Sequence, residues 1–179
     1  MFRKAEILSR IELRQSTIKD WLSCPLMFRY RHVLQLAPSY RSLAAIHGSA
    51  LHLCIHRLHR GGFDLDLDLL YTQALEEVLE SESHIPIRWK KGVLEDRLTM
   101  MTHAEEILRG YVNHNQNRTS RLLYSEAKFR VRVSGMLLTG TIDQVRRNMD
   151  STLELIDLKS GMQRPMKHAL QRDWQLNLY

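Results

Sequence analysis

The chain is poor in cysteine and has no long hydrophobic run. Only two of its 179 residues are cysteine, Cys24 and Cys54. That number is too small for a disulfide-stapled scaffold and fits a reducing cytoplasm. No apolar stretch approaches the ~20 residues that a membrane-spanning helix needs, and residues 1–6 have no apolar segment of the secretory kind. We therefore expect a cytoplasmic protein that makes no contact with a membrane.

Internal repeats and low-complexity segments are also missing, and acidic residues are outnumbered by basic ones. The composition, 44% hydrophobic and 26% charged, is globular and excludes a disordered chain. The 26 Lys and Arg residues against 20 Asp and Glu give a net charge of +6. This balance favours a polyanionic partner, nucleic acid first. A basic protein without such a partner remains the alternative.

Two helices are predicted in the first third of the chain. Residues 17–30 form the first, with Thr17 and Asp20 as an approximate capping box and Pro25 as an interruption. Residues 44–58 form the second, in which Gly48 costs about 1 kcal/mol against Ala and so indicates a close approach by another segment. Gly61-Gly62 ends this helix. The apolar faces are Ile18, Trp21 and Leu22 in the first helix, and Leu51, Ile55 and Leu58 in the second.

The middle of the chain is predicted to be helical and its last third to contain a sheet. Helical periodicity covers residues 65–80 and 94–114, which we interpret as a helical insertion spanning about 64–117 in a single domain of residues 1–179. Three strands in a meander follow, at 126–133, 137–146 and 152–159, with Ala127, Phe129, Val131 and Val133 facing inward on the first. Turns fall at Ser134-Gly135 and 148–151, and a helix covers 166–179.

Asp157 and Lys159 form the first candidate site. Residues two apart on a strand share a face, so the two side chains lie together while Leu158 points away. Leu153 and Leu155 precede them on that face, which puts the pair at the rim of an apolar surface. For an isolated Asp-x-Lys, a simple salt bridge is the commoner explanation.

Asp143 on the preceding strand is a second candidate. The turn at 148–151 places it near Asp157, and two carboxylates together are costly unless a cation such as Mg²⁺ neutralises them. Two solvated surface aspartates are the alternative. His52, His56 and His59, at i, i+4 and i+7, could add a ligand or form a Zn²⁺ site. A partly exposed polar helix face is the simpler interpretation of His56 and His59.

Four short motifs follow one another along the chain: Gly48-x-x-x-His52, Gly140-Thr141-Ile142-Asp143, Asp157-Leu158-Lys159-Ser160-Gly161 and Gln175-x-x-x-Tyr179. Their order resembles that of PD-(D/E)XK nucleases of the RecB/AddB and CRISPR-associated exonuclease type. Residues 16–30, with Cys24-Pro25 and Phe28-Arg29-Tyr30, resemble the opening segment of that family, and Glu126 matches a frequent family acid. The resemblance covers nearly the whole chain and is weakest over residues 64–117.

The resemblance implies a fold, a reaction and a cofactor. The fold would be α/β (α+β), a restriction-endonuclease-like core with a central mixed sheet flanked by helices. His52, Asp143, Asp157 and the backbone carbonyl of Leu158 would bind Mg²⁺ or Mn²⁺, with Glu126 as a possible additional acid. Lys159 would orient the attacking water and offset charge on the phosphorus. Gln175 and Tyr179 would hold Lys159 or the DNA backbone, and the candidate phosphate contacts are Arg130, Arg132, Arg146 and Arg147.

The expected activity is that of a metal-dependent DNA nuclease, an exonuclease in the first place, acting on single strands or duplex ends. A bacterial, archaeal or phage setting follows from the resemblance, with recombination, repair, phage replication and CRISPR adaptation all open. A catalytically inactive nucleic-acid-binding module on the same fold is the alternative, and a Zn²⁺ hydrolase built on His52, His56 and His59 is a third. Cleavage polarity, strand preference and oligomeric state are left open.

Two departures from the family pattern concern the ends of the chain. Many relatives carry a four-cysteine iron–sulfur cluster, and Cys24 matches its first ligand. No cysteine follows Cys54, so we expect no iron–sulfur cluster within this chain. The chain also stops at Tyr179, the last motif residue, where relatives usually continue. Either the chain is truncated at its C-terminus or the family core is minimal here.

Overall fold

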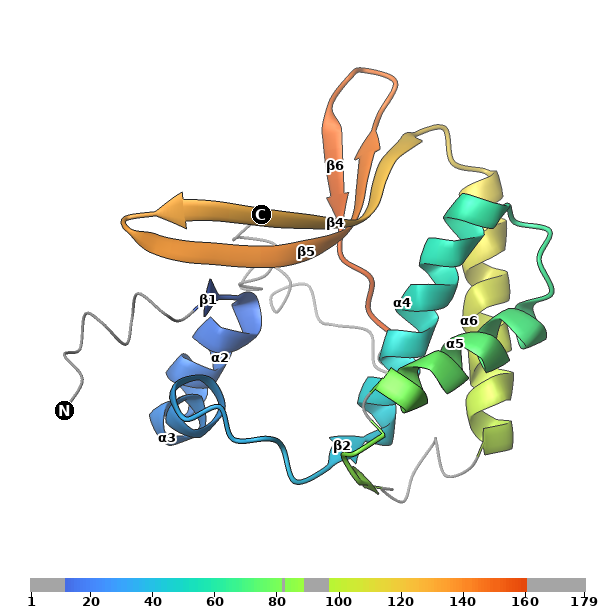
Figure 1. The fold of residues 1–179 in the computed structure, drawn as a ribbon. Helices are drawn as coiled ribbons and strands as arrows, with labels where there is room; N and C mark the ends of the chain where they lie inside the picture. Colours follow the sequence, from blue (N-terminus) through green and yellow to red (C-terminus); the bar gives the residue numbers. More distant parts are fainter. Residues whose placement is uncertain (1–11, 82, 89–96, 161–179) are drawn as a thin grey trace.

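The computed structural model describes residues 12–81, 83–88 and 97–160. Five helices and six strands lie in these ranges (Figure 1). The helices are α2 (Gln15–Ser23), α3 (Pro25–Phe28), α4 (Leu43–Gly61), α5 (Leu67–Ser81) and α6 (Arg97–Gln116), with a wide π-type turn at Arg29–Val33. The strands are β1 (Glu12–Leu13), β2 (Arg41–Ser42), β3 (Ile87–Arg88), β4 (Arg121–Val133), β5 (Met136–Arg147) and β6 (Leu153–Ile156). This mixed α/β architecture confirms the predicted fold class.

The main sheet is built around β5. Strand β4 runs antiparallel to β5 along nearly its whole length, β6 pairs antiparallel with its last residues, and β1 pairs parallel with Leu137 and Leu138 near its start. The sheet is therefore mixed, as predicted. Strand β6 pairs with β5 alone in the described part, and it is shorter than the predicted strand at 152–159. The strand ends at Ile156, and Asp157 and Lys159 follow it.

A two-residue turn joins β4 and β5 into a long hairpin. Ser134 and Gly135 both have positive φ, 50° and 80°, as the tight turns that match the twist of a hairpin require. Val131 and Val133 are 46% and 51% exposed, so their predicted inward orientation is wrong. By alternation they lie on the face opposite Arg130, and it is the Arg130 face that meets α2.

The main hydrophobic core of the described residues lies between α4, α5 and α6. Helix α4 begins at the Ser42 cap, whose Oγ accepts the Ala45 N–H at 3.2 Å, and ends at Gly62, where φ is +99°. Its predicted stripe is confirmed, because Leu51, Ile55 and Leu58 are all buried. Each such side chain stabilises the fold by about 1.5–3 kcal/mol. The partners from α5 and α6 include Tyr71, Ala74, Met100, Ala104 and Leu108.

Helices α5 and α6 fall within the segment that the sequence analysis interprets as an insertion. They confirm the helical periodicity, although residues 94–96 lie outside the described part. Both pack on α4 and supply much of the described core. That residues 64–117 form an insertion in a single domain stays a prediction.

The N-terminal helices differ from the predicted capping and burial. Arg14, with an extended backbone, is the N-cap of α2, so the capping box is wrong. Thr17 is buried inside the helix and donates to the Glu12 carbonyl at 3.4 Å. The Asp20 carboxylate instead accepts from Arg31 at 3.1 Å and contacts His32 at 3.0 Å. These long-range partners outcompete the local cap.

The predicted apolar face of this segment is also wrong in part. Trp21 and Leu22 are more than half exposed, whereas Phe28 is buried. The Trp21 ring meets Phe28 edge-on at 5.1 Å between ring centroids. The interruption is confirmed, because α2 ends at Ser23 and Pro25 occupies the first position of α3. The predicted helix at 166–179, which includes Gln175 and Tyr179, lies outside the described residues.

Candidate metal and nucleic-acid site

Helix α4 positions His52 against the sheet. Its buried stripe faces α5 and α6, and His52 is half-buried on the side facing β4 and β5. Gly48 lies one turn earlier, and a Cβ there would be 3.0 Å from Oγ of Ser160. The glycine therefore admits the segment that follows β6. This confirms the expected close approach, with the difference that a side chain rather than backbone makes the contact.

Three side chains from three elements converge at the base of the hairpin. They are His52 of α4, Glu126 of β4 and Asp143 of β5, and one ligand atom from each lies within 4.8 Å of the other two. Nδ1 of His52 is 3.5 Å from Oε1 of Glu126 and 3.5 Å from Oδ1 of Asp143. Asp143 is buried, whereas His52 and Glu126 are partly exposed. The structure thus brings together two predicted ligands and the possible additional acid.

Glu126 adopts an unusual backbone conformation. Its φ is +56°, and its neighbours Ser125 and Ala127 pair with Gln144 and Ile142, which places Glu126 opposite Asp143. A left-handed backbone at a residue other than glycine costs about 1–3 kcal/mol and occurs most often at functional sites. The strand is therefore strained at the position that brings its carboxylate to His52.

The two carboxylates control the charge of His52. The contact with Asp143, followed by that with Glu126, outweighs burial and raises the pKa of His52 to about 10. The imidazolium offsets part of the negative charge that the two carboxylates would otherwise concentrate here. A divalent cation would do the same, and carboxylate oxygens with one imidazole are a donor set that Mg²⁺ or Mn²⁺ accepts. The residues present therefore fit a metal of this class.

The segment 157–159 lies beside this cluster. The Leu158 N–H donates to Oδ2 of Asp143 at 2.5 Å. Asp157, with a side chain 5% exposed, forms an ion pair with Nζ of Lys159, which is 49% exposed. The predicted proximity of these two side chains is thus confirmed. Asp157 is not in the group that could hold a metal within the described ranges, so its role as a ligand, like that of the Leu158 carbonyl, stays a prediction.

Two hollows meet at His52 and Ser160. A hollow of about 280 Å³ is lined by Leu158 and Lys159 together with Tyr111 and other residues of α4 and α6. A larger one of about 850 Å³ is lined by Gly48, Glu126 and Lys128 among others. The cluster is therefore open to a solute from two sides.

A comparison with known families assigns this arrangement. The model of the PD-(D/E)XK nuclease superfamily matches residues 12–179, nearly the whole chain. The chain belongs to the PD-(D/E)XK nuclease superfamily. No curated protein matches it significantly. Its place in the RecB/AddB branch stays a prediction. None of the helices described in this superfamily member is both long and apolar enough to cross a membrane.

The other histidines of α4 have partners outside the cluster. Nδ1 of His56 is 3.1 Å from Oγ of Ser125, and Nε2 of His59 is 2.5 Å from the Tyr111 hydroxyl. Burial lowers the pKa of His59 to about 4, so its ring is neutral. In the described residues neither belongs to the possible metal group. A zinc site built on His52, His56 and His59 is therefore not supported.

One predicted phosphate contact is structural in this nuclease superfamily member. Arg146 is buried, donates to Oγ and the carbonyl oxygen of Ser120 at 3.0 and 2.8 Å, and reaches Asn115 at 3.2 Å. It therefore fastens the end of α6 to β5 and is not accessible to a phosphate. The other three predicted contacts, Arg130, Arg132 and Arg147, are exposed.

The glycine of the second motif has a packing reason that sequence reasoning did not find. A Cβ at Gly140 would lie 2.5 Å from the ring of Phe129, its cross-strand partner. The aromatic ring therefore occupies the space of the missing side chain. The alternating pattern of β4 in the sequence assigns Phe129 to one face of the strand, but it does not identify Gly140 as the residue opposite.

Proposed function

We propose that this chain is a metal-dependent deoxyribonuclease of the exonuclease type, which hydrolyses phosphodiester bonds in DNA recombination, repair or defence. The observation that carries the proposal is the convergence of His52, Glu126 and Asp143 beside segment 157–159 in a member of a nuclease superfamily. The excess of basic residues adds support for a DNA substrate.

In this proposal His52, Glu126 and Asp143 hold Mg²⁺ or Mn²⁺, and Asp157 and the Leu158 carbonyl complete the ligand set. The cation, when bound, polarises the scissile phosphate and lowers the pKa of a bound water. His52 would hold the cation as the neutral imidazole, and the two carboxylates that raise its pKa would face the charge of the cation instead.

Lys159 supplies the remaining positive charge. Its ammonium group is paired with Asp157 and half exposed to solvent, at the wall of the smaller hollow. We assign it the orientation of the attacking water and the stabilisation of charge that develops on the phosphorus. Gln175 and Tyr179 keep their proposed task of holding Lys159 or the DNA backbone.

The proposal is tested with end-labelled and internally labelled DNA, single- and double-stranded, in Mg²⁺, Mn²⁺ or EDTA. We expect cleavage in the metals, none in EDTA, and mononucleotide release from an end. Asp143→Asn should abolish cleavage. Replacing Asp64, an exposed aspartate that lines a separate hollow, with Asn should not. DNA binding without cleavage in any metal would replace the proposal with the inactive binding module.

A further inference from the structure

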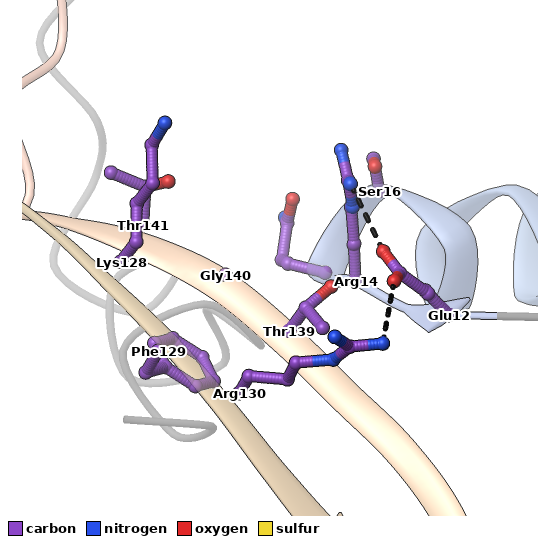
Figure 2. A pocket seen from close by; sticks show the side chains of 10 residues that line it. Glu12, Arg14, Ser16, Lys128, Phe129, Arg130, Thr139, Gly140 and Thr141 are labelled. Atoms are coloured by element: carbon purple, nitrogen blue, oxygen red, sulfur yellow. Dashed lines mark hydrogen bonds and ion pairs between the residues drawn. The ribbon is translucent and has the colours of Figure 1, made fainter.

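A further hollow, apart from the two at His52, lies between the start of α2 and the β4–β5 hairpin (Figure 2). It measures about 520 Å³ and shares no lining residue with the metal cluster. Its charged and hydroxyl-bearing walls come from four elements. They are Glu12 of β1, Lys128 and Arg130 of β4, Thr139 and Thr141 of β5, and Arg14 at the N-cap of α2.

The charge of this hollow suits an anion. Three positive side chains, Arg14, Lys128 and Arg130, face one carboxylate, Glu12. Glu12 accepts from Arg14 at 3.2 Å and pairs with Arg130 at 3.5 Å, as the dashed lines of Figure 2 show. The side chains of Glu12, Arg14 and Arg130 are each 41% or more exposed. Ion pairs that are exposed to this degree contribute about 0–1 kcal/mol to stability. The Glu12 carboxylate therefore occupies a position between two arginines that suits an anion, and it is held weakly enough for a phosphate to replace it.

A buried hydroxyl on the wall lacks a partner. Thr139 is only 9% exposed, and its Oγ1 makes no hydrogen bond within the described part of the chain. Leaving such a group unsatisfied costs about 1–3 kcal/mol. Thr139 pairs directly with Arg130 across the strands, so the two side chains project from the same face of the hairpin. A phosphate oxygen would accept from both.

The first turn of α2 adds backbone donors. Gln15 and Ser16 line the hollow, and no side chain caps the helix. The first N–H groups of a helix have no partner inside it, and together with the helix dipole they favour a negative charge.

Lys128 connects this hollow to the metal cluster. It lines both the α2 hollow and the larger hollow that contains His52 and Glu126. Along β4, Arg130 and Lys128 occupy successive positions on one face, paired with Thr139 and Thr141, at steps of about 7 Å. Glu126 follows two residues further along the strand. A basic row thus leads from the hollow to the cluster.

We propose that the hollow is a phosphate-binding subsite that holds a backbone phosphate of the DNA strand a few linkages away from the bond that is cut. Arg130, Arg14 and the Thr139 hydroxyl bind the phosphate, which displaces Glu12. The inference rests on the proposed function, because it takes the metal cluster as the site of cleavage.

Binding is measured without cleavage, by fluorescence anisotropy of a labelled thymidine oligonucleotide in EDTA over a range of salt concentrations. Arg130→Gln should weaken binding about tenfold and reduce the salt slope by about one phosphate contact. Thr139→Val should weaken it several-fold with the slope unchanged, and Thr139→Ser should restore it. Glu12→Gln should strengthen binding, since it removes the competing carboxylate. The matched control, Arg109→Gln on α6, carries the same charge change and should leave both quantities unaltered.

A chemical cycle then locates the phosphate. Neutral methylphosphonate linkages are placed one at a time along the oligonucleotide, and single-turnover cleavage in Mn²⁺ is followed. At one position, a few linkages from the cut, the neutral linkage should slow cleavage by the wild-type protein about tenfold. The same linkage should not slow cleavage by Arg130→Gln, which has already lost the contact. Equal behaviour of Arg130→Gln and Arg109→Gln with an active wild type would overturn the subsite alone. A wild type that binds DNA but never cleaves it would overturn the proposed function.

Discussion

The backbone N–H of Leu158 donates to the Asp143 carboxylate at 2.5 Å. This bond uses a donor that would otherwise continue the ladder between β5 and β6, and it coincides with the end of β6 at Ile156. Segment 157–159 is thereby fastened to the residue that also contacts His52. One carboxylate serves both the candidate metal site and the placement of Lys159.

Substitutions of Asp143 should separate these two tasks. In Asp143→Asn the amide oxygen still accepts from Leu158, although the charged His52 loses one partner, so the free energy of unfolding should fall less than in Asp143→Ala. Mn²⁺ affinity should fall at least tenfold, because a charged ligand is lost. Asp143→Ala should lose the metal and a further 1–3 kcal/mol or so of stability. Urea unfolding and calorimetric Mn²⁺ titration provide the two readouts. Equal stability of the two variants would contradict the anchoring role.

Replacing Lys159 with Ala should abolish cleavage and leave DNA and metal affinity nearly unchanged. It is one of 26 basic residues, so the number of neutralised phosphates hardly alters. The lost charge should cost about 10²–10³ in rate. Lys159→Arg should not recover the rate, because a planar guanidinium does not replace a compact ammonium. Single-turnover cleavage and affinity at fixed salt decide this, and a retained rate in Lys159→Ala would remove Lys159 from the mechanism.

Stability should decrease below neutral pH because of His47. Burial, and then the neighbouring His103, lower the pKa of His47 from 6.5 to about 4. Its ring lies between the Tyr71 hydroxyl at 2.6 Å and Nδ1 of His103 at 2.9 Å. The unfolded chain binds this proton more readily, so its contribution is complete above pH 6.5 and is lost as the pH falls towards 4. We expect His47 to contribute about 2 kcal/mol to the loss of stability between pH 7 and pH 5, beside the contribution of His59, whose pKa burial lowers in the same way.

Urea unfolding at the two pH values measures this loss. His47→Gln should be less stable at pH 7 and show a flatter dependence on pH, whereas His84→Gln, an exposed histidine, should keep the wild-type dependence. A His47→Gln profile parallel to wild type would show that His47 is not the group responsible.

Gly140→Ala should destabilise the hairpin. The new Cβ would lie 2.5 Å from the Phe129 ring, and an overpacked contact of this kind costs about 1–3 kcal/mol. Gly110→Ala is the matched control, because Gly110 lies in α6 with open space around its Cβ position and should gain up to about 1 kcal/mol. Thermal unfolding of both variants gives the comparison. Adding Phe129→Leu should recover part of the loss at Gly140, and no recovery would mean that the ring is not the obstacle.

The hydrophobic periodicity of the sequence predicted those elements whose structure depends on residues close to one another in the chain. The stripe of α4 and the strand β5 follow from periodicity, and the meeting of His52 with Asp143 follows from motifs in a recognisable order. Thr17 and Asp20 look like a capping box, but their partners are Glu12, Arg31 and His32, and periodicity carries no information about such distant contacts.

Two further features depend on tertiary structure in the same way. Glu126 has a positive φ, but the sequence does not indicate it, because the position is not occupied by glycine or asparagine. The exposure of Val131 and Val133 depends on which face of the hairpin meets α2. The alternation of β4 separates its two faces without saying which one is covered.

The β4–β5 hairpin fixes the distance between the metal cluster and the phosphate subsite of the proposed nuclease. Glu126 and Arg130 are four residues apart on one strand, with Asp143 and Thr139 in the same relation on the other, a span of about 13 Å. Because paired strands stretch very little, the separation between the cutting position and the phosphate grip is set by the number of peptide units. A DNA strand too short to span this separation no longer reaches the phosphate subsite, although it still reaches the metal cluster. Cleavage should therefore become slower below a fixed oligonucleotide length.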